Sequence, residues 1–133
     1  MRNNFIQTDF YKFEIDREIN RGYITFVGVW TLELVPNYIR DIELFAKELK
    51  KDFTLIADIR KFITGPVEIT KLHIQAQKIL KDSGLQKAAE IENKSLMQKI
   101  SSQKYVQESG MERYVFSNIE DAEKYLNQIY IKN

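Results

Sequence analysis

The residues from Phe53 to Pro66 constrain the fold of this chain more than any other segment. They read Phe-Thr-Leu-Ile-Ala-Asp-Ile-Arg-Lys-Phe-Ile-Thr-Gly-Pro, a nearly apolar run up to Asp58 that is followed by a Gly-Pro turn. A strand that is apolar on both faces is typical of the interior of a sheet that helices cover. The segment therefore predicts a buried strand that ends at Asp58, and a helix that the turn opens. In α/β domains such a junction is where binding sites usually lie.

A hairpin and a first helix are predicted ahead of this strand. Residues 20–22, Asn-Arg-Gly, supply a turn between an alternating run over 13–19 and a nearly apolar run over 23–30. After Trp30 the apolar residues recur at three- and four-residue steps, and Pro36 suits the first turn of a helix. The apolar stripe of that helix consists of Val35, Ile39, Ile42, Phe45 and Leu49.

The chain after Pro66 continues to alternate helix and strand. A second helical stripe consists of Ile69, Leu72, Ala76, Ile79 and Leu80. Gly84 and Gly110 each predict the end of a helix, because glycine readily takes the left-handed conformation that closes a helix. A strand is predicted after each glycine, over 87–92 and 112–116.

Two more helices complete the prediction. Asn93 or Ser95 can cap a third helix, which carries Leu96, Met97 and Ile100. The capping box Ser117-Asn118-Ile119-Glu120 opens a fourth, with Ile119, Ala122, Leu126 and Ile129 on one face. The predicted order is β-β-α-β-α-β-α-β-α, which indicates an α/β fold: a five-stranded mixed sheet with an amino-terminal hairpin and about four helices.

The composition excludes several classes of function. The 133 residues suit a single domain over 1–133, and 20 basic against 19 acidic side chains leave no field that would attract nucleic acid. The absence of cysteine and the presence of one histidine exclude thiol chemistry and multi-histidine sites, so we expect no metal and no cofactor. There is no signal peptide and no apolar run of about 20 residues, and we therefore expect a cytoplasmic protein without a transmembrane segment.

The element order, the apolar strand before Asp58 and the pattern Arg-Tyr-Val-Phe-Ser-Asn-Ile-Glu-Asp-Ala-Glu-Lys-Tyr-Leu over 113–126 together resemble one family. It is the STAS-like domains, and within them the uncharacterised SpoIIAA-like branch of the anti-sigma-factor antagonist fold. The resemblance extends over roughly Tyr11 to Ile129. It implies a small module that binds a protein partner and is not an enzyme, and we accordingly assign no catalytic residue.

The resemblance also bears on regulation. In the signalling members, the loop after the buried strand carries a serine whose phosphorylation switches binding to a partner kinase. In this sequence the corresponding positions are near Val67 and Glu68, which have no hydroxyl. Thr64 and Thr70 are offset from them, and Thr64 is equally suited to capping the second helix. We therefore expect a regulatory or scaffold module without an intact phosphoserine switch.

The candidate binding residues are Trp30, Asp58, Arg60, Phe62, Thr64 and Gly65. Asp58 and Arg60 could orient a polar ligand group or pair with each other; alternatively, Asp58 caps backbone amides while Arg60 is solvated. Trp30 and Phe62 could line an apolar pocket, or could belong to the core or to a subunit contact. His73 lies one position off the second helical stripe, and we expect it to be partly exposed.

Two functions remain open. The first is a regulatory or scaffold domain that binds a protein through the loop and helix after Asp58. The second is a carrier or sensor of a nonpolar small molecule or lipid, because STAS-like folds resemble lipid-carrying domains and the chain is rich in aromatic and branched side chains. The aromatic content, 12% of the residues, would also allow a homodimer.

Overall fold

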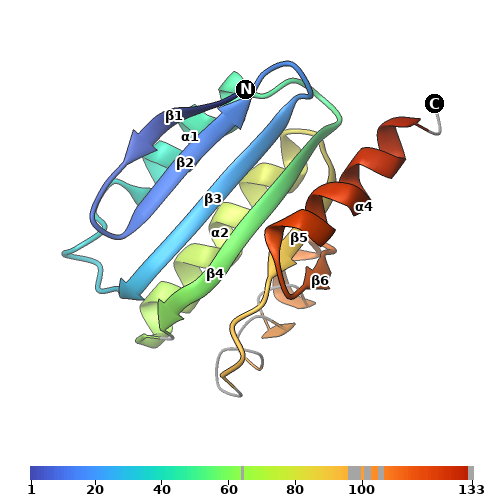
Figure 1. The fold of residues 1–133 in the computed structure, drawn as a ribbon. Helices are drawn as coiled ribbons and strands as arrows, with labels where there is room; N and C mark the ends of the chain where they lie inside the picture. The colour runs from blue at the N-terminus through green and yellow to red at the C-terminus, as the bar shows by residue number, and fades with distance from the viewer. Residues whose placement is uncertain (64, 96–99, 101–102, 105–106, 132–133) are drawn as a thin grey trace.

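The computed structural model describes the chain apart from residues 64, 96–99, 101–102, 105–106 and 132–133. Within that part, a six-stranded sheet has its strands in the order in which they occur in the sequence (Figure 1). The strands are β1 (Arg2–Gln7), β2 (Tyr11–Asp16), β3 (Arg21–Val29), β4 (Phe53–Ile63), β5 (Leu85–Ile91) and β6 (Tyr114–Phe116). The first three pair antiparallel, and β3 to β6 pair parallel. The predicted mixed α/β fold is confirmed.

The first strand, β1, is absent from the sequence prediction, which gave five strands. It pairs with β2 antiparallel, and the register shifts between Asn4 and Ile6. Both Phe5 and Ile6 pack against the main core although they are adjacent in sequence. A bulge therefore breaks the alternation of apolar and polar residues by which a strand is recognised.

In the described part of the chain, three helices of more than ten residues pack on the two faces of the sheet. They are α1 (Tyr38–Glu48), α2 (Val67–Asp82) and α4 (Ile119–Ile131). Figure 1 shows α1 and α2 together behind the sheet and α4 in front of it. Residues 100, 103–104 and 107–109 are helical as well, but Leu96 and Met97 of the predicted third helix lie outside the described residues. None of the described helices has both the length and the apolar character needed to cross a membrane.

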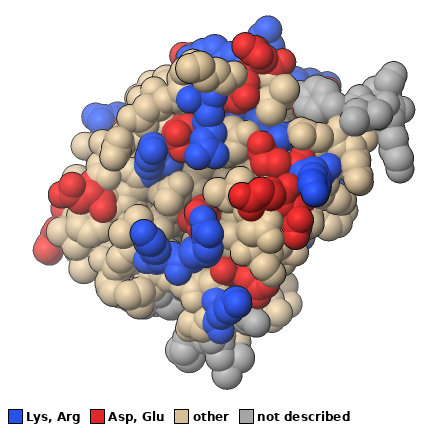
Figure 2. Space-filling view, viewed as in Figure 1, with Lys and Arg blue, Asp and Glu red and all other residues tan. Residues whose placement is uncertain are grey.

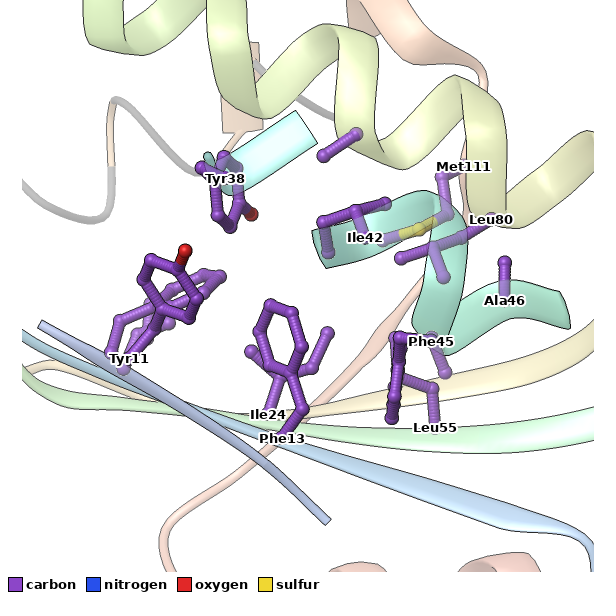
Figure 3. Packing of buried hydrophobic residues seen from close by; sticks show 14 of the residues in the cluster. Tyr11, Phe13, Ile24, Tyr38, Ile42, Phe45, Ala46, Leu55, Leu80 and Met111 are labelled. Atoms are coloured by element: carbon purple, nitrogen blue, oxygen red, sulfur yellow. The ribbon is translucent and has the colours of Figure 1, made fainter. Parts of the chain in front are cut away.

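The main core lies between the sheet and the pair α1 and α2 (Figure 3). The predicted stripes of both helices supply it, with Ile42, Phe45 and Ile69 essentially inaccessible to solvent. Phe45 lies directly over Gly22 of β3, where a Cβ atom would come within 2.5 Å of its ring. Glycine is therefore required at this position by close packing rather than by a turn.

A second, smaller core lies under α4. Ala122 and Leu126 of α4 contact Tyr23, Ile56 and Ala89 of the central strands. These two helix residues belong to the predicted fourth stripe and are fully buried. The helix begins one residue later than the predicted capping box implies, because Asn118 rather than Ser117 accepts the capping hydrogen bond, from the backbone amide of Asp121 at 2.9 Å.

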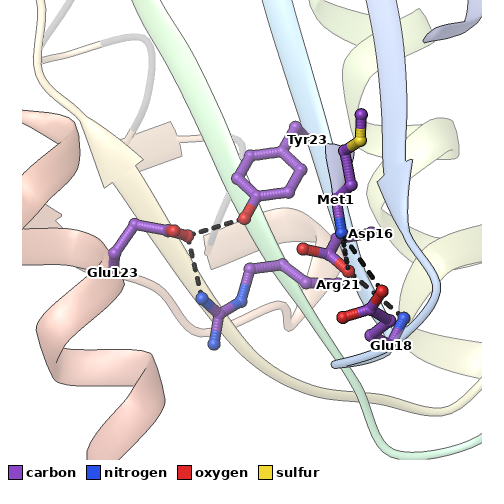
Figure 4. A network of polar contacts seen from close by, with 6 residues as sticks. All are labelled: Met1, Asp16, Glu18, Arg21, Tyr23 and Glu123. Atoms are coloured by element: carbon purple, nitrogen blue, oxygen red, sulfur yellow. Dashed lines mark hydrogen bonds and ion pairs between the residues drawn. The ribbon is translucent and has the colours of Figure 1, made fainter. Parts of the chain in front are cut away.

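A buried polar network fastens α4 to the sheet (Figure 4). Arg21 is 0% exposed, and its Nη1 donates to Glu123 Oε1 at 2.8 Å while its Nε donates to Thr54 Oγ1 at 2.9 Å. The hydroxyl of Tyr23 donates to the same Glu123 oxygen at 2.8 Å. Burial, together with this hydrogen bond, raises the pKa of Tyr23 to about 12. The prediction that placed Arg21 in a turn is wrong. Arg21 is the first residue of β3, and its backbone lies opposite that of Asp16 in β2.

Two predicted boundaries differ from the structure. Pro36 lies in a turn before α1, which begins at Tyr38 with Asn37 as its N-cap residue. The buried strand does not end at Asp58 but continues to Ile63, because Lys61, Phe62 and Ile63 pair with Val27, Gly28 and Val29 of β3. The prediction used the first polar residue as the strand end, whereas backbone pairing extends beyond it.

Candidate functional site

A bulge in β4 organises the carboxyl ends of β3 and β4. The pairing passes from Thr25 opposite Asp58 directly to Val27 opposite Lys61, so β4 contains one more residue than β3 over this interval. A bulge turns local side chains away from regular alternation and commonly occurs next to functional sites. Here it leaves the side chain of Arg60 exposed beside Asp58.

Asp58 and Arg60 form a bidentate pair at this bulge. Asp58 Oδ2 accepts from Arg60 Nη2 at 2.7 Å, and Oδ1 accepts from Arg60 Nε at 3.0 Å and from the Arg60 backbone amide at 3.1 Å. Burial alone would raise the pKa of Asp58, but these hydrogen bonds and the positive charges of Arg60 and Lys61 lower it below its ordinary value. The two residues pair with each other, as one of the sequence interpretations allowed, and Asp58 also caps a backbone amide.

The pair lines a hollow beside the second halves of β3 and β4. The hollow has a volume of about 410 Å³ and is lined by Thr25, Phe26, Val27, Asp58, Arg60 and Lys61. In Figure 2, Lys and Arg side chains gather over the carboxyl ends of β3 and β4, while Asp and Glu side chains gather over α4. Because the Asp58 carboxylate is paired with Arg60, Lys61 contributes the positive charge that remains on this surface.

Exposed apolar side chains follow these lining residues along the chain. Val29 and Ile63 pair across β3 and β4, and they are 46% and 57% exposed. Val27 and, at the start of α2, Val67 are exposed as well. We call the set Val27, Val29, Arg60, Lys61, Ile63 and Val67 the strand-end surface. It combines apolar contacts with positive charge, which suits a protein partner better than a small polar substrate.

Hydrogen bonds from Asn93 and close packing at Gly65 hold this surface in place. The side-chain amide of Asn93 donates to the backbone carbonyl of Phe62 at 2.7 Å, and to those of Ile59 and Arg60 at 3.3 Å. Asn93 thus stabilises the backbone of the bulge, a role that was not predicted from the sequence. At Gly65 a Cβ atom would lie 2.9 Å from the backbone oxygen of Trp30, so the loop before α2 packs closely against the end of β3. Thr64 lies outside the described residues.

Trp30 and Phe62 lie beneath the surface, inside the main core. Trp30 is 0% exposed, its indole donates to the Val27 carbonyl at 3.1 Å, and its ring centroid is 5.2 Å from that of Phe62. Of the six candidate residues, Arg60 belongs to the strand-end surface, Asp58 is paired with it, and Gly65 lies in the loop between Ile63 and Val67. The two aromatic rings fill the core below. Trp30 would have to move before a ligand could reach it.

The expectation that His73 is partly exposed is wrong. It is 3% exposed, packs against the rings of Phe26, Trp30 and Phe62, and its Nδ1 lies 3.3 Å from the Tyr38 hydroxyl. Burial lowers the pKa of His73 to about 3, so the imidazole is neutral in the folded protein. The sequence interpretation followed a single stripe on α2, whereas this helix contacts both the sheet and α1.

The described residues contain no cluster of three or more His, Cys, Asp or Glu side chains that could hold a metal ion.

No protein-family model matches the chain, and no curated protein matches it either. Solved structures do match. The anti-sigma factor antagonist SpoIIAA in its unphosphorylated form is 12% identical, with a TM-score of 0.60 over 96% of this chain and 97% of that one. The chain has the SpoIIAA-like fold. Apo-SiaC from Pseudomonas aeruginosa is 9% identical, with a TM-score of 0.55 over 86% of this chain and 98% of that one. The STAS-like fold predicted from the sequence is thereby confirmed.

The strand-end surface has a definite place in the SpoIIAA-like fold. The surface lies where a buried parallel strand, β4, passes into a covering helix, α2, which is the junction that the sequence pattern indicated. At this junction the chain has a bulge, a bidentate ion pair and exposed apolar residues. No serine is present in residues 53–82, which comprise β4, the loop and α2.

Proposed function

We propose that this protein is a non-catalytic regulatory module that binds a protein partner through the strand-end surface. The observation that carries the proposal is the exposure of Val29 and Ile63 beside Arg60 and Lys61, at the ends of two strands whose first halves are buried. Desolvation of such apolar side chains favours association, and the adjacent cations select a partner with an acidic rim.

The structural neighbours support the same proposal. SpoIIAA is an anti-sigma factor antagonist, and it therefore acts on another protein. A shared fold does not determine function, so the proposal depends on the surface that this chain presents at the corresponding junction. We place the contact at the loop and at the first turn of α2, where Val67 is exposed.

We further propose that serine phosphorylation at the start of α2 does not control this binding. Val67 and Glu68 occupy the first two positions of α2, and neither can accept a phosphate. Thr70 lies in the first turn and is half-buried. Control by partner abundance or by a different site is then expected.

The test is an affinity capture with matched variants. Purified wild-type protein, Ile63→Asp, Lys61→Glu and the control Lys78→Glu are immobilised and incubated with lysate of the native cell, and bound proteins are quantified by mass spectrometry. Lys78 is exposed on α2 and is not part of the strand-end surface. We expect at least one protein that wild type and Lys78→Glu retain and that both surface variants lose.

The captured protein is then purified, and its affinity is measured by calorimetry. Ile63→Asp removes an apolar side chain that the partner would cover and introduces an unpaired charge. It is expected to weaken binding about tenfold or more, a free-energy change of about 1.4 kcal/mol. Retention of the same proteins by all four forms, or an unchanged affinity of the purified partner for Ile63→Asp, would show that the contact lies elsewhere.

A further inference from the structure

A second polar hollow lies at the opposite end of the parallel strands. It has a volume of about 330 Å³ and is lined by Lys81, Leu85, Gln86, Lys87, Gly110, Met111, Glu112 and Tyr114. These residues come from the end of α2, the start of β5 and the segment that leads into β6. The hollow is thus separate from the strand-end surface, and the proposed function does not involve it.

The sheet itself creates this hollow. Among the described strands, β6 pairs only with Ala89, Glu90 and Ile91, which are the second half of β5. The first half, from Leu85 to Ala88, pairs with β4 but has no described strand on its other side. Leu85, Gln86 and Lys87 of this half line the hollow, which we call the notch. A strand segment without a neighbouring strand leaves backbone groups on that side open to a ligand.

Two lysines converge on the notch. Lys81 extends from the last turn of α2 over Gly110, where an added Cβ atom would lie 2.8 Å from Lys81 Nζ. Gly110 has a φ of +75°, a conformation that favours glycine, and the absent side chain leaves the space for the ammonium group. Lys87 Nζ lies 3.2 Å from the Tyr114 hydroxyl. Within the described part of the chain, neither Lys81 nor Lys87 forms an ion pair.

The Tyr114 hydroxyl is polarised by its neighbours. A hydrogen bond from Lys87, and after it one from Tyr125, lower the pKa of Tyr114 below its ordinary value. Because the phenol oxygen accepts these bonds, its own proton is available to a further acceptor. The ring of Tyr114 packs against that of Tyr125, with the centroids 4.8 Å apart and the planes tilted by 43°. One carboxylate, Glu112, also lines the notch and partly offsets the positive charge.

We propose that this notch binds the phosphate group of a phosphate monoester, with Lys81 and Lys87 as the cationic contacts and the Tyr114 hydroxyl as a third donor. Two lysine ammonium groups and a hydroxyl match the charge of about −2 and the several acceptor oxygens of a phosphate monoester better than the single charge of a carboxylate. The volume of about 330 Å³ leaves room for an organic group beside the phosphate. The ester can come from a soluble metabolite or from a lipid headgroup.

The test is a titration followed by ¹H–¹⁵N NMR at constant ionic strength. Inorganic phosphate and O-phosphoethanolamine serve as soluble probes, and acetate serves as the comparison anion. We expect saturable shifts of the amides of Gln86, Lys87, Gly110 and Glu112 with both phosphates, and no saturation with acetate. Lys81→Gln and Lys87→Gln should each weaken binding about tenfold or more, since each removes a charge-assisted hydrogen bond. The matched control Lys78→Gln, which is exposed one turn earlier on α2, should bind as wild type does.

Flotation with phosphatidylcholine vesicles that contain phosphatidic acid distinguishes the sources. Binding of the soluble ester alone assigns a soluble ligand, and binding to the vesicles that Lys87→Gln abolishes assigns a lipid headgroup; both support the site. Shifts that do not saturate and no vesicle binding would overturn it. Equal affinity for acetate, or equal affinities of wild type, Lys81→Gln and Lys87→Gln, would likewise overturn it.

Discussion

Acidification should destabilise this protein through a single side chain, His73. It is the one histidine in the sequence, it is 3% exposed, and burial lowers its pKa to about 3. In the unfolded chain its pKa returns to about 6.5. Between these two values the unfolded state binds a proton that the folded state does not. The free energy of unfolding therefore falls as the pH falls from about 6.5 toward 3.

The size of the effect follows from the two pKa values. Between pH 7 and pH 5 the folded imidazole stays neutral, while the unfolded imidazole changes from about a quarter to nearly fully protonated. Linkage then gives a loss of about 2 kcal/mol over this interval, with a slope that approaches 1.36 kcal/mol per pH unit. The interval lies above the ordinary pKa values of carboxyl groups, so His73 should dominate the change.

The assay is urea unfolding at several pH values from 7 to 5, followed by the fluorescence of Trp30 and by circular dichroism. Trp30 is the one tryptophan and is packed against His73 at 5.0 Å between ring centroids, so it reports directly on this part of the core. The control is His73→Gln, which cannot titrate. We expect its midpoint to be nearly independent of pH over the same interval, even if its stability at pH 7 is lower.

The reasoning would be refuted by a wild-type stability that changes by less than about 0.5 kcal/mol between pH 7 and 5, or by the same slope in His73→Gln. An independent check is the NMR signal of the His73 ring in the folded protein. It should show no titration above pH 5, whereas titration near 6.5 would show that the ring is accessible to water.

Three further predictions concern other parts of the molecule. Glu123→Ala leaves the buried guanidinium of Arg21 without its carboxylate, and urea unfolding should show that the free energy of unfolding falls by about 2–4 kcal/mol. The additional change Arg21→Met should restore part of this stability, because it removes the unpaired charge. An additive effect of the two changes would contradict the coupling. Lys87→Ala removes the first cause of the lowered pKa of Tyr114, so a titration of tyrosine absorbance at 295 nm should begin at higher pH than in wild type; an unchanged curve would exclude the contact. Gly22→Ala places a Cβ atom 2.5 Å from a phenylalanine ring of α1, and thermal unfolding should show a loss of about 1–3 kcal/mol, whereas an unchanged melting temperature would show that the ring moves freely.

Much of the fold could be predicted because its signals are local. Helix α2 is recognisable from one apolar stripe and from Gly84, which has a φ of +106° in the structure. The parallel arrangement of β4 and β5 follows from the helix between them, since a crossover of this length joins parallel strands. Strand β1 escaped prediction because the bulge after Asn4 destroys its local alternation.

The candidate site was only partly predictable. Asp58 and Arg60 were recognised because a carboxylate at the end of an apolar run is conspicuous in a sequence. Asn93 was not, since it is 33 residues from Arg60 along the chain and contacts the bulge only after β5 has paired with β4. The burial of His73 was also missed, because it results from the packing of α2 against α1.

The sequence by itself determined the order of the later elements, the stripes of the helices and the chemistry that is available, because periodicity and composition are properties of neighbouring residues. Only the tertiary structure decided how far the segment from Phe53 to Pro66 remains a strand, since backbone pairing with β3 carries it through Asp58 to Ile63. It also decided which charges are buried. Arg21 and Glu123 are 102 residues apart, and they meet only where α4 packs on the sheet.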